Sequence, residues 1–340
     1  MIKINPSKSN SFNLFKLFNL DVKRNRKGFT YILVTTLMVA ILLSIFFAAN
    51  KYRYQDQESL QQVRIRAMND FTKNLNTDIH RATYISAFRT LLALEDHVTT
   101  TGIYLTDINE SFRETFYYGT INGTSSPIMT NSTFGDYVSK VGNISRTTGI
   151  ILNINVTHIS LMQSDPWTID VHMFMNITIV DSKRTASWNI NNEYVTAVPI
   201  NNLRDPLYSK NTFNKVPNTI RRLNSTVLVN GSDTSMLQKH INGSYYLASS
   251  FAPNFIMRFE GKTDADPKGI ESIIDNRILL NSELLAYPDR IKVDYIYFND
   301  ILETKLCVNL TTSPSGGPFI IPSNRRFLYQ VENLTPTACP

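Results

Sequence analysis

One uncharged apolar run, Phe29–Ala49, constrains this chain more than any other feature of its sequence. The run holds 21 residues, and a helix needs about 20 to cross the hydrocarbon layer of a bilayer. The segment before it has one acidic residue, Asp21, against seven basic ones: Lys3, Lys8, Lys16, Lys23, Arg24, Arg26 and Lys27. An excess of Lys and Arg keeps the flanking segment in the cytoplasm. We therefore expect a single-pass helix at 29–49 in the plasma membrane, with a cytoplasmic N-terminus and an extracellular C-terminal domain.

A cleaved secretory signal is the alternative interpretation of the same run. Signal peptides have an apolar core of about 7–15 residues and a cleavage site of the small-x-small type. Here the run is longer, and no such site precedes Asn50. The membrane-spanning interpretation is therefore favoured.

Triplets of the form Asn-x-Ser/Thr, which accept N-linked glycans, indicate the same topology independently. Eleven triplets lie beyond the apolar run, and the one in the tail, Asn5-Pro6-Ser7, is barred by its proline. We expect a glycosylated extracellular domain, the alternative being an Asn- and Thr-rich composition without glycans. The candidate acceptors are Asn109, Asn122, Asn131, Asn143, Asn155, Asn176, Asn224, Asn230, Asn242, Asn309 and Asn333.

The net charge of +6 does not indicate a nucleic-acid partner. The basic tail accounts for all of it, because the remainder of the chain has 27 basic and 27 acidic residues. A balanced domain lacks the basic surface that DNA or RNA requires. We therefore exclude nucleic acid and expect the lipid bilayer as the first partner.

Both cysteines, Cys307 and Cys339, fall near the C-terminus, on the side of the membrane expected to be oxidising. An even count at close spacing favours a disulfide that closes a C-terminal loop, worth about 3–4 kcal/mol in the chain-entropy model. Two free buried thiols are the alternative. A metal site is disfavoured because no further Cys or His lies nearby.

Helix signals dominate the first 150 residues. Neither Gly nor Pro occurs within 29–101, which predicts one long helix to about His97. Beyond the membrane, an apolar stripe at steps of three and four runs through Leu60, Val63, Ala67, Phe71, Leu75, Ile79, Ala82 and Ile85. The spacing of Ile108, Phe112 and Phe116 predicts a second helix, and that of Tyr137, Val141 and Ile144 a third, which starts at a capping box near Thr133 and stops at Gly149.

Strand signals follow from Ile150 onwards. The segments 150–162, 168–180 and 187–198 predict an antiparallel meander, its first hairpin turning at 164–167. Further strands are expected at 225–230, 254–259, 291–298 and 326–331, with a short helix at 270–275. The predicted fold class is α+β: a tail at 1–28, a transmembrane helix at 29–49, a helical part at 50–149, a β meander at 150–200, and a second β-rich part at 201–340 with the disulfide loop.

The sequence contains no motif for catalysis, and we predict no cofactor and no metal. Among the five histidines, His158 and His172 share the predicted hairpin, and a turn centred between Asp165 and Pro166 places them on opposite faces. The segment 264–269 imitates a calcium loop, but Lys268 occupies a ligand position. Catalytic carboxylates dispersed along the chain would leave no signature in one sequence.

Six aromatic residues could line a sugar- or partner-binding surface, or else fill a core: Trp167, Trp188, Tyr245, Tyr246, Tyr295 and Tyr297.

The basic tail, the Lys27-Gly28-Phe29-Thr30 border, the helix that passes from apolar to amphipathic, the sheet and the cysteine pair together resemble the type IV pilin superfamily, particularly archaeal pilin-like surface proteins with a class III signal peptide. The resemblance implies that a prepilin peptidase cuts between Gly28 and Phe29, and that copies of the chain then bundle through their apolar helices. It also implies a disulfide-closed terminal region. Many pilins have Glu at the fifth mature position, where this chain has Leu33.

Our first hypothesis is therefore a glycosylated, pilin-like structural or adhesive subunit at the cell surface, assembling with copies of itself or with other pilin-like subunits. The second is a permanently anchored module that binds glycans or envelope components. An anchored hydrolase is the third.

Overall fold

The protein is described by a computed structural model that covers residues 26–310 and 318–340. Helices make up 43% and strands 23%, which confirms the α+β class. The chain divides into two compact units with the boundary between Arg66 and Ala67. The predicted tail, apart from its last three residues, lies outside the described part of the chain.

The first helix, α1, runs from Arg26 to Thr101 without interruption and confirms the long helix predicted from the absence of Gly and Pro. In the second unit one face of α1 is buried. The predicted stripe is correct at Leu75 and Ile79, which are buried, and at Phe71 and Ala82, which pack half-buried against the core. Val63, Ala67 and Ile85 are exposed, and the side chain of Leu60 lies outside the described part. The buried face instead contains small polar residues among the apolar ones: Met68, Leu75, Ile79, Thr83, Ser86, Ala87, Thr90, Leu91, Leu94 and Val98.

Hydroxyl groups can be buried on this face because they find acceptors nearby. Thr83 Oγ1 donates to the Ile79 carbonyl at 2.8 Å, and Thr90 Oγ1 donates to the Ser86 carbonyl at 2.8 Å. Such bonds to the preceding turn remove the cost of burying an unpaired hydroxyl. A stripe defined by hydropathy alone therefore departs from the face that packs.

Two further helices begin and end where their caps require. Helix α2, Ile108–Tyr118, starts at Asp107, whose carboxylate accepts from two backbone amides, and ends at Gly119 in the left-handed conformation. Helix α3, Phe134–Thr147, has the predicted capping box between Thr133 and Asp136. Between the two helices lie a small hairpin and a 3₁₀ turn: β1, Thr120–Ile121; β2, Thr124–Ser125; and η2, Pro127–Met129.

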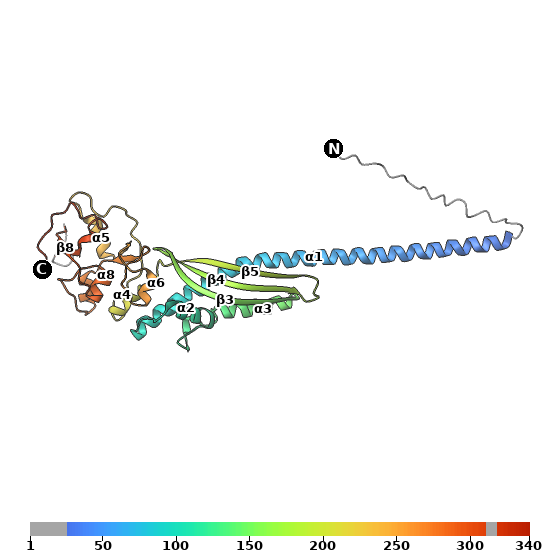
Figure 1. Cartoon of the computed structure of the whole chain (residues 1–340), viewed down its shortest axis with the longest axis horizontal. Helices are drawn as coiled ribbons and strands as arrows, with labels where there is room; N and C mark the ends of the chain where they lie inside the picture. The colour runs from blue at the N-terminus through green and yellow to red at the C-terminus, as the bar shows by residue number, and fades with distance from the viewer. Residues whose placement is uncertain (1–25, 311–317) are drawn as a thin grey trace, which may run out of the picture. The chain divides into compact units, whose positions relative to one another are not determined.

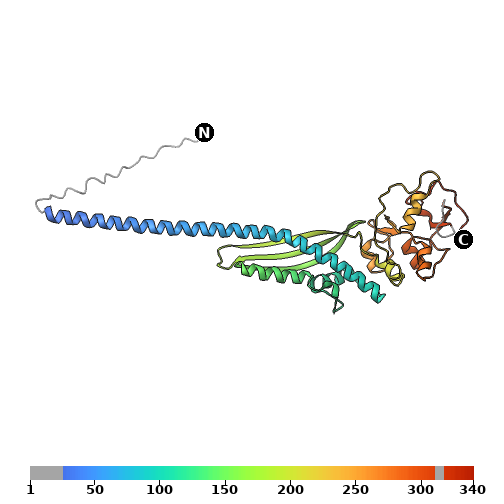
Figure 2. The same cartoon turned by 180° about the vertical axis from the view of Figure 1, so that it is seen from behind.

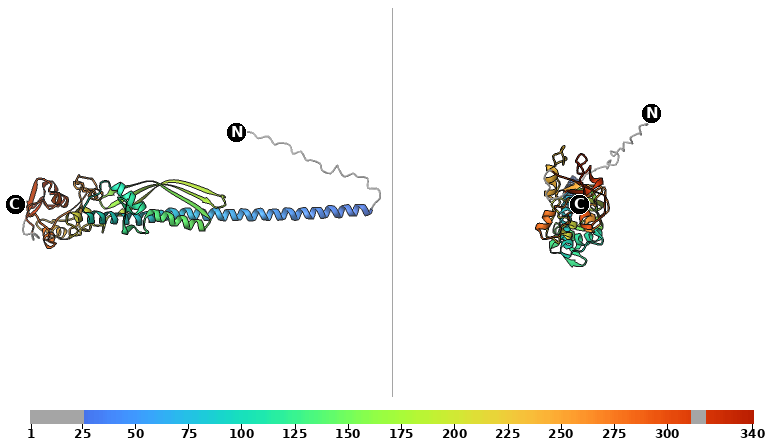
Figure 3. Two further views of the ribbon diagram at one scale, coloured as in Figure 1. Left: turned by 90° about the horizontal axis from the view of Figure 1, so that it is seen from below. Right: turned by 90° about the vertical axis from the view of Figure 1, so that its left-hand side faces the viewer.

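Three long antiparallel strands form the main sheet, in the order β3-β4-β5. Their bounds are Ile150–Asp165, Thr168–Asp181 and Ser187–Pro199, which confirms the predicted meander. Alternate residues of β4 are buried, because one face of the sheet is covered by α2, α3 and the second half of α1 (Figures 1, 2 and 3). The opposite face carries Asn, Thr and His side chains.

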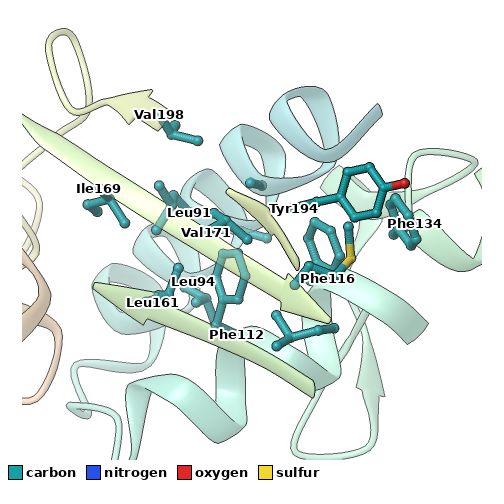
Figure 4. Close-up of a cluster of buried hydrophobic side chains, with 14 of the residues drawn as sticks. Leu91, Leu94, Phe112, Phe116, Phe134, Leu161, Ile169, Val171, Tyr194 and Val198 are labelled. Carbon is teal, nitrogen blue, oxygen red and sulfur yellow. The ribbon is translucent and has the colours of Figure 1, made fainter. Parts of the chain in front are cut away.

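The main core lies between this sheet and these helices. Figure 4 shows Leu91 and Leu94 of α1 and the rings of Phe112, Phe116 and Phe134 facing the strands. Phe112 stacks on Phe116 with ring centroids 5.4 Å apart, and Phe116 stacks on Phe134 at 5.3 Å. Because a buried Phe contributes about 1.5–3 kcal/mol, this aromatic row is a large part of what holds the helices to the sheet.

Residues 201–340 are not the second β-rich part that the sequence predicts. Each predicted strand there is wrong: 254–259 and 291–298 are mainly helical, while 225–230 and 326–331 contain no named strand. The predicted helix at 270–275 is also wrong, since Ile270–Ser272 is a strand. The helices are α4, Pro206–Asn211; α5, Ser235–Asn242; α6, Phe255–Phe259; α7, Asn276–Asn281; and α8, Asp294–Asn299. The short paired strands are β6, Tyr246–Ala248, with β7, Ile270–Ser272, and β8, Lys305–Val308, with β9, Phe319–Pro322, which precedes the 3₁₀ turn η3, Ser323–Arg325.

Candidate functional site

The apolar run is the clearest functional feature of the chain. Over Gly28–Lys51 the mean hydropathy is 2.7, and none of this segment is buried within the protein. Its hydroxyls are satisfied inside the helix: Thr35 donates to the Tyr31 carbonyl at 2.9 Å, and Ser44 donates to the Ala40 carbonyl at 2.8 Å. In hydrocarbon every polar group must be paired internally, and these groups are. Among the described residues, this is the one helix long and apolar enough to cross a membrane.

Gly28 and Phe29, the proposed cleavage pair, lie in the first turn of α1. A Cβ added at Gly28 would have no neighbour within 4 Å, and the Phe29 side chain is 55% exposed. The peptide bond between them is therefore not covered by other parts of the described chain.

All eleven candidate glycan acceptors are exposed. Asn122 and Asn131 lie in turns with positive φ, of 51° and 57°. Asn155 on the edge strand β3 lies directly opposite Asn176 on the central strand β4, on the uncovered face of the sheet. These positions are open to modification, and at two of them the amide oxygen is hydrogen-bonded within the chain: Asn109 Oδ1 accepts from Leu161 N, and Asn242 Oδ1 accepts from Arg277 Nη2.

The cysteine pair forms the predicted disulfide. Cys307 and Cys339 are joined with their Cα atoms 5.4 Å apart, across a sequence separation of 32. Cys307 lies on β8 and is 1% exposed. The bond thus fixes the C-terminus to a buried strand.

The predicted faces of His158 and His172 are wrong. His158 is paired with Phe174, and His172 with Ser160, so both histidines lie on the uncovered face of the sheet. A register shift between Gln163 and Asp165 adds one residue to β3 and reverses the assignment made from a symmetric turn. His172 Nδ1 lies 2.7 Å from Glu193 Oε1, and no group of three potential ligands that could hold a metal occurs in the described residues.

The aromatic residues named from the sequence lie mostly in cores. Tyr246, Tyr295 and Tyr297 are at most 2% exposed, and the two tryptophans are half-buried against the main core. In the calcium-like segment, Asp266 Oδ1 instead accepts from the Lys268 amide at 2.7 Å and so closes a turn.

A buried ionic centre that the sequence did not indicate holds residues 201–340 together. Arg258 on α6 is fully buried, and its Nη1 lies 2.5 Å from Asp205 Oδ2 and 2.9 Å from Asp294 Oδ2. Its Nη2 donates to the Ile270 carbonyl, and Tyr246 Oη donates to Asp205 at 2.8 Å. Burial raises the pKa of the Asp294 carboxyl, while Arg258 acts in the opposite direction.

A second buried pair lies between Arg325 and Glu271. The Nε to Oε2 distance is 3.4 Å, and the hydroxyl of Tyr329 donates to Glu271 Oε1 at 2.8 Å. Burial raises the pKa of the Glu271 carboxyl against the effect of Arg325. The side chains of both sets are at most 2% exposed, so these charges lie within the packed interior of this part of the chain.

A hollow of about 460 Å³ opens on the surface of residues 201–340. Its lining comes from the end of α4, α7 with the loop after it, and α8: Asn211, Thr212, Phe213, Lys215, Leu279, Glu283, Leu284, Leu285, Tyr287, Arg290, Tyr297 and Phe298. No local sequence signal indicates this hollow, because its lining comes from three separate segments of the chain.

No protein-family model, no curated protein and no solved structure matches this chain.

Proposed function

We propose that this chain is a membrane-anchored cell-surface protein, a pilin-like structural or adhesive subunit with a glycosylated α+β domain outside the cell. One observation carries the proposal. Helix α1 begins with an apolar segment that no part of the described chain covers, and from Met68 onwards it supplies buried residues to the α+β unit. An uncovered apolar surface of this size requires lipid or another apolar helix around it.

Two further observations support the outward orientation. The basic residues lie before the span, and all eleven glycan acceptors lie after it on exposed positions. The disulfide favours an oxidising compartment for the same unit.

The pilin route adds a processing step. A peptidase cuts after Gly28, and the mature helix, now starting at Phe29, packs with the helices of other copies. In this chain Leu33 takes the place of the usual Glu, so registration between copies depends on apolar packing.

A permanently anchored module that binds glycans or envelope components is the second candidate. The aromatic-lined hollow favours it, because ligand sites are concave and combine apolar walls with a few polar groups.

Mass spectrometry of the mature N-terminus, on protein extracted from membranes, separates the two candidates. A start at Phe29 is the expected result for the pilin route, whereas a start at Met1 or Ile2 indicates a fixed anchor. Gly28→Leu should abolish the cut. Gly142→Leu, on α3 with no neighbour within 4 Å of the added Cβ, is the matched control.

Protease added to intact cells tests the orientation. We expect it to degrade residues beyond the span. Protection of the bulk of the chain, or recovery of an uncut chain from cytosol without detergent, would contradict the proposal.

A further inference from the structure

The hollow beside α7 and α8 has one rigid aromatic wall. Tyr297 and Phe298 of α8 pack edge to face with ring centroids 5.6 Å apart, and Tyr208 packs on Phe298 at 5.1 Å. The Tyr297 hydroxyl accepts from the Tyr287 amide at 2.8 Å, which fixes the loop that carries the Tyr287 ring. The wall is therefore formed before any ligand binds.

The lining also includes an exposed ring on left-handed backbone. The Phe213 side chain is 78% exposed, and its φ is +52°. Glu283, another lining residue, has φ of +57°. Left-handed backbone is uncommon for a bulky residue, and non-glycine strain of this kind concentrates at ligand-binding positions. The Phe213 ring is not covered by the described chain, so it is open to a ligand in the hollow.

The charges around the hollow neutralise one another. Lys215 Nζ lies 3.9 Å from Glu283 Oε2, and Arg290 Nη2 lies 3.0 Å from Asp300 Oδ2. The Arg290 guanidinium also lies over the Tyr287 ring at 3.9 Å. Since each cation already has an anion, the site has no excess charge for an ionic ligand. It suits an uncharged molecule with hydroxyl groups.

None of the residues that line the hollow is a glycan acceptor. No triplet occurs between Asn242 and Asn309, and neither Asn211 nor Asn214 is followed by Ser or Thr at the required place. Asn242 is the acceptor in contact with α7, since its Oδ1 accepts from Arg277 Nη2 at 2.8 Å.

We propose that the hollow binds a neutral carbohydrate, one sugar ring packing on the two exposed aromatic rings of its lining, Phe213 and Tyr287, with its hydroxyls hydrogen-bonding to Lys215, Glu283 and Arg290. The C–H face of a pyranose is apolar and flat enough to cover an aromatic ring, while its edge is polar. A lipid chain would need an enclosed apolar cavity, and this hollow is polar at its rim. The carbohydrate proposal rests on the proposed function in one respect, that the second unit lies outside the cell. If the chain is an adhesive subunit, the hollow is the site through which it binds.

The test uses the full-length chain in a polyoxyethylene detergent, because detergents with sugar headgroups would compete. A printed array of neutral and anionic oligosaccharides is probed with the wild-type chain, and the affinity for the best neutral oligosaccharide is then measured by titration calorimetry. Phe213→Asn is the informative variant, since Asn tolerates the left-handed backbone and the chain should fold at least as stably. Its affinity should fall by about tenfold or more.

Phe327→Ala is the matched control, because Phe327 is also exposed, at 74%, and does not line the hollow. Its affinity should equal that of the wild type. A blank array, binding of anionic glycans only, or equal affinity of the Phe213→Asn variant would overturn the assignment. So would a protein partner that binds the wild type but not this variant while the array stays blank. These binding experiments use purified protein, so their results do not depend on where the protein lies in the cell. A failure of the carbohydrate proposal can therefore be told apart from a failure of the protease test on intact cells.

Discussion

A buried carboxyl on α1 makes the stability of the second unit depend on pH. Glu95 is 6% exposed, and its one described ion-pair partner, Arg204, is half-exposed with its Nε 3.8 Å away. Burial raises the pKa of the Glu95 carboxyl from 4.5 to about 7, and the opposing effect of Arg204 is smaller. The folded chain thus favours the protonated form, whereas the unfolded chain releases the proton near its ordinary pKa.

The sign and size of the effect come from this difference. Below pH 4.5 both states are protonated, and the group does not affect stability. As the pH rises from 4.5 to 7, the unfolded state loses its proton first and the folded state becomes less stable. The full loss above pH 7 is about 3 kcal/mol, at about 1.4 kcal/mol for each pKa unit.

Glu95→Gln removes the titration and keeps the shape of the side chain. We expect the variant to gain stability over the wild type as the pH rises, from near zero at about pH 4 to about 2–3 kcal/mol at about pH 8. Urea unfolding of the full chain in micelles measures it, monitored by fluorescence of Trp167 and Trp188, which both contact the main core. Glu110→Gln, at an exposed position, should change little at any pH. A difference between Glu95→Gln and wild type that stays constant with pH would refute the reasoning.

Two further substitutions test the cross-links of residues 201–340, both by urea unfolding. Cys307→Ser should cost about 3–4 kcal/mol and make stability insensitive to dithiothreitol; unchanged stability would argue against the bond's contribution. Arg258→Met leaves Asp205 and Asp294 buried without their cation and should cost about 3–5 kcal/mol; a cost below about 1 kcal/mol would show that the ionic centre contributes little.

The long helices and strands between residues 26 and 200 were predictable because their signals are long. An alternation of apolar and polar residues sustained over more than ten positions has one interpretation, as in β4. The caps of α2 and α3 are local and arise directly from Asp107 and Thr133. The register at His158 was not predictable, because one extra residue in β3 near the turn reverses the faces of β3 as far as a second shift between Val156 and His158.

The remaining part was predicted wrongly because its elements are too short to show a period. Six residues rich in Phe and Ile, such as 254–259, are compatible with strand or helix. A usable signal was the polar residue just before three of these helices: Asp205, Asn254 and Asp275 accept hydrogen bonds from the first turns of α4, α6 and α7. At α6, which was predicted as a strand, this cap outweighs the β propensity of the residues after it.

Some features of the candidate site could be predicted from the sequence and others could not. The span, the disulfide and the exposed Asn triplets could be predicted from the sequence because each is defined by residue identity and spacing. The hollow could not, since Phe213, Glu283 and Tyr297 lie far apart in the sequence and are brought together only by the packing of α4, α7 and α8.

The contacts of Arg258 have a consequence for how this half of the molecule opens. Its guanidinium binds Asp205, Ile270 and Asp294, which belong to segments spread over nearly ninety positions of the sequence. If one of these segments opens alone, the charges that remain buried lose a partner, which is costly. The segments should therefore open as one cooperative unit. Amide hydrogens around these positions would then exchange with solvent at a common rate, without progressive fraying from the C-terminal end.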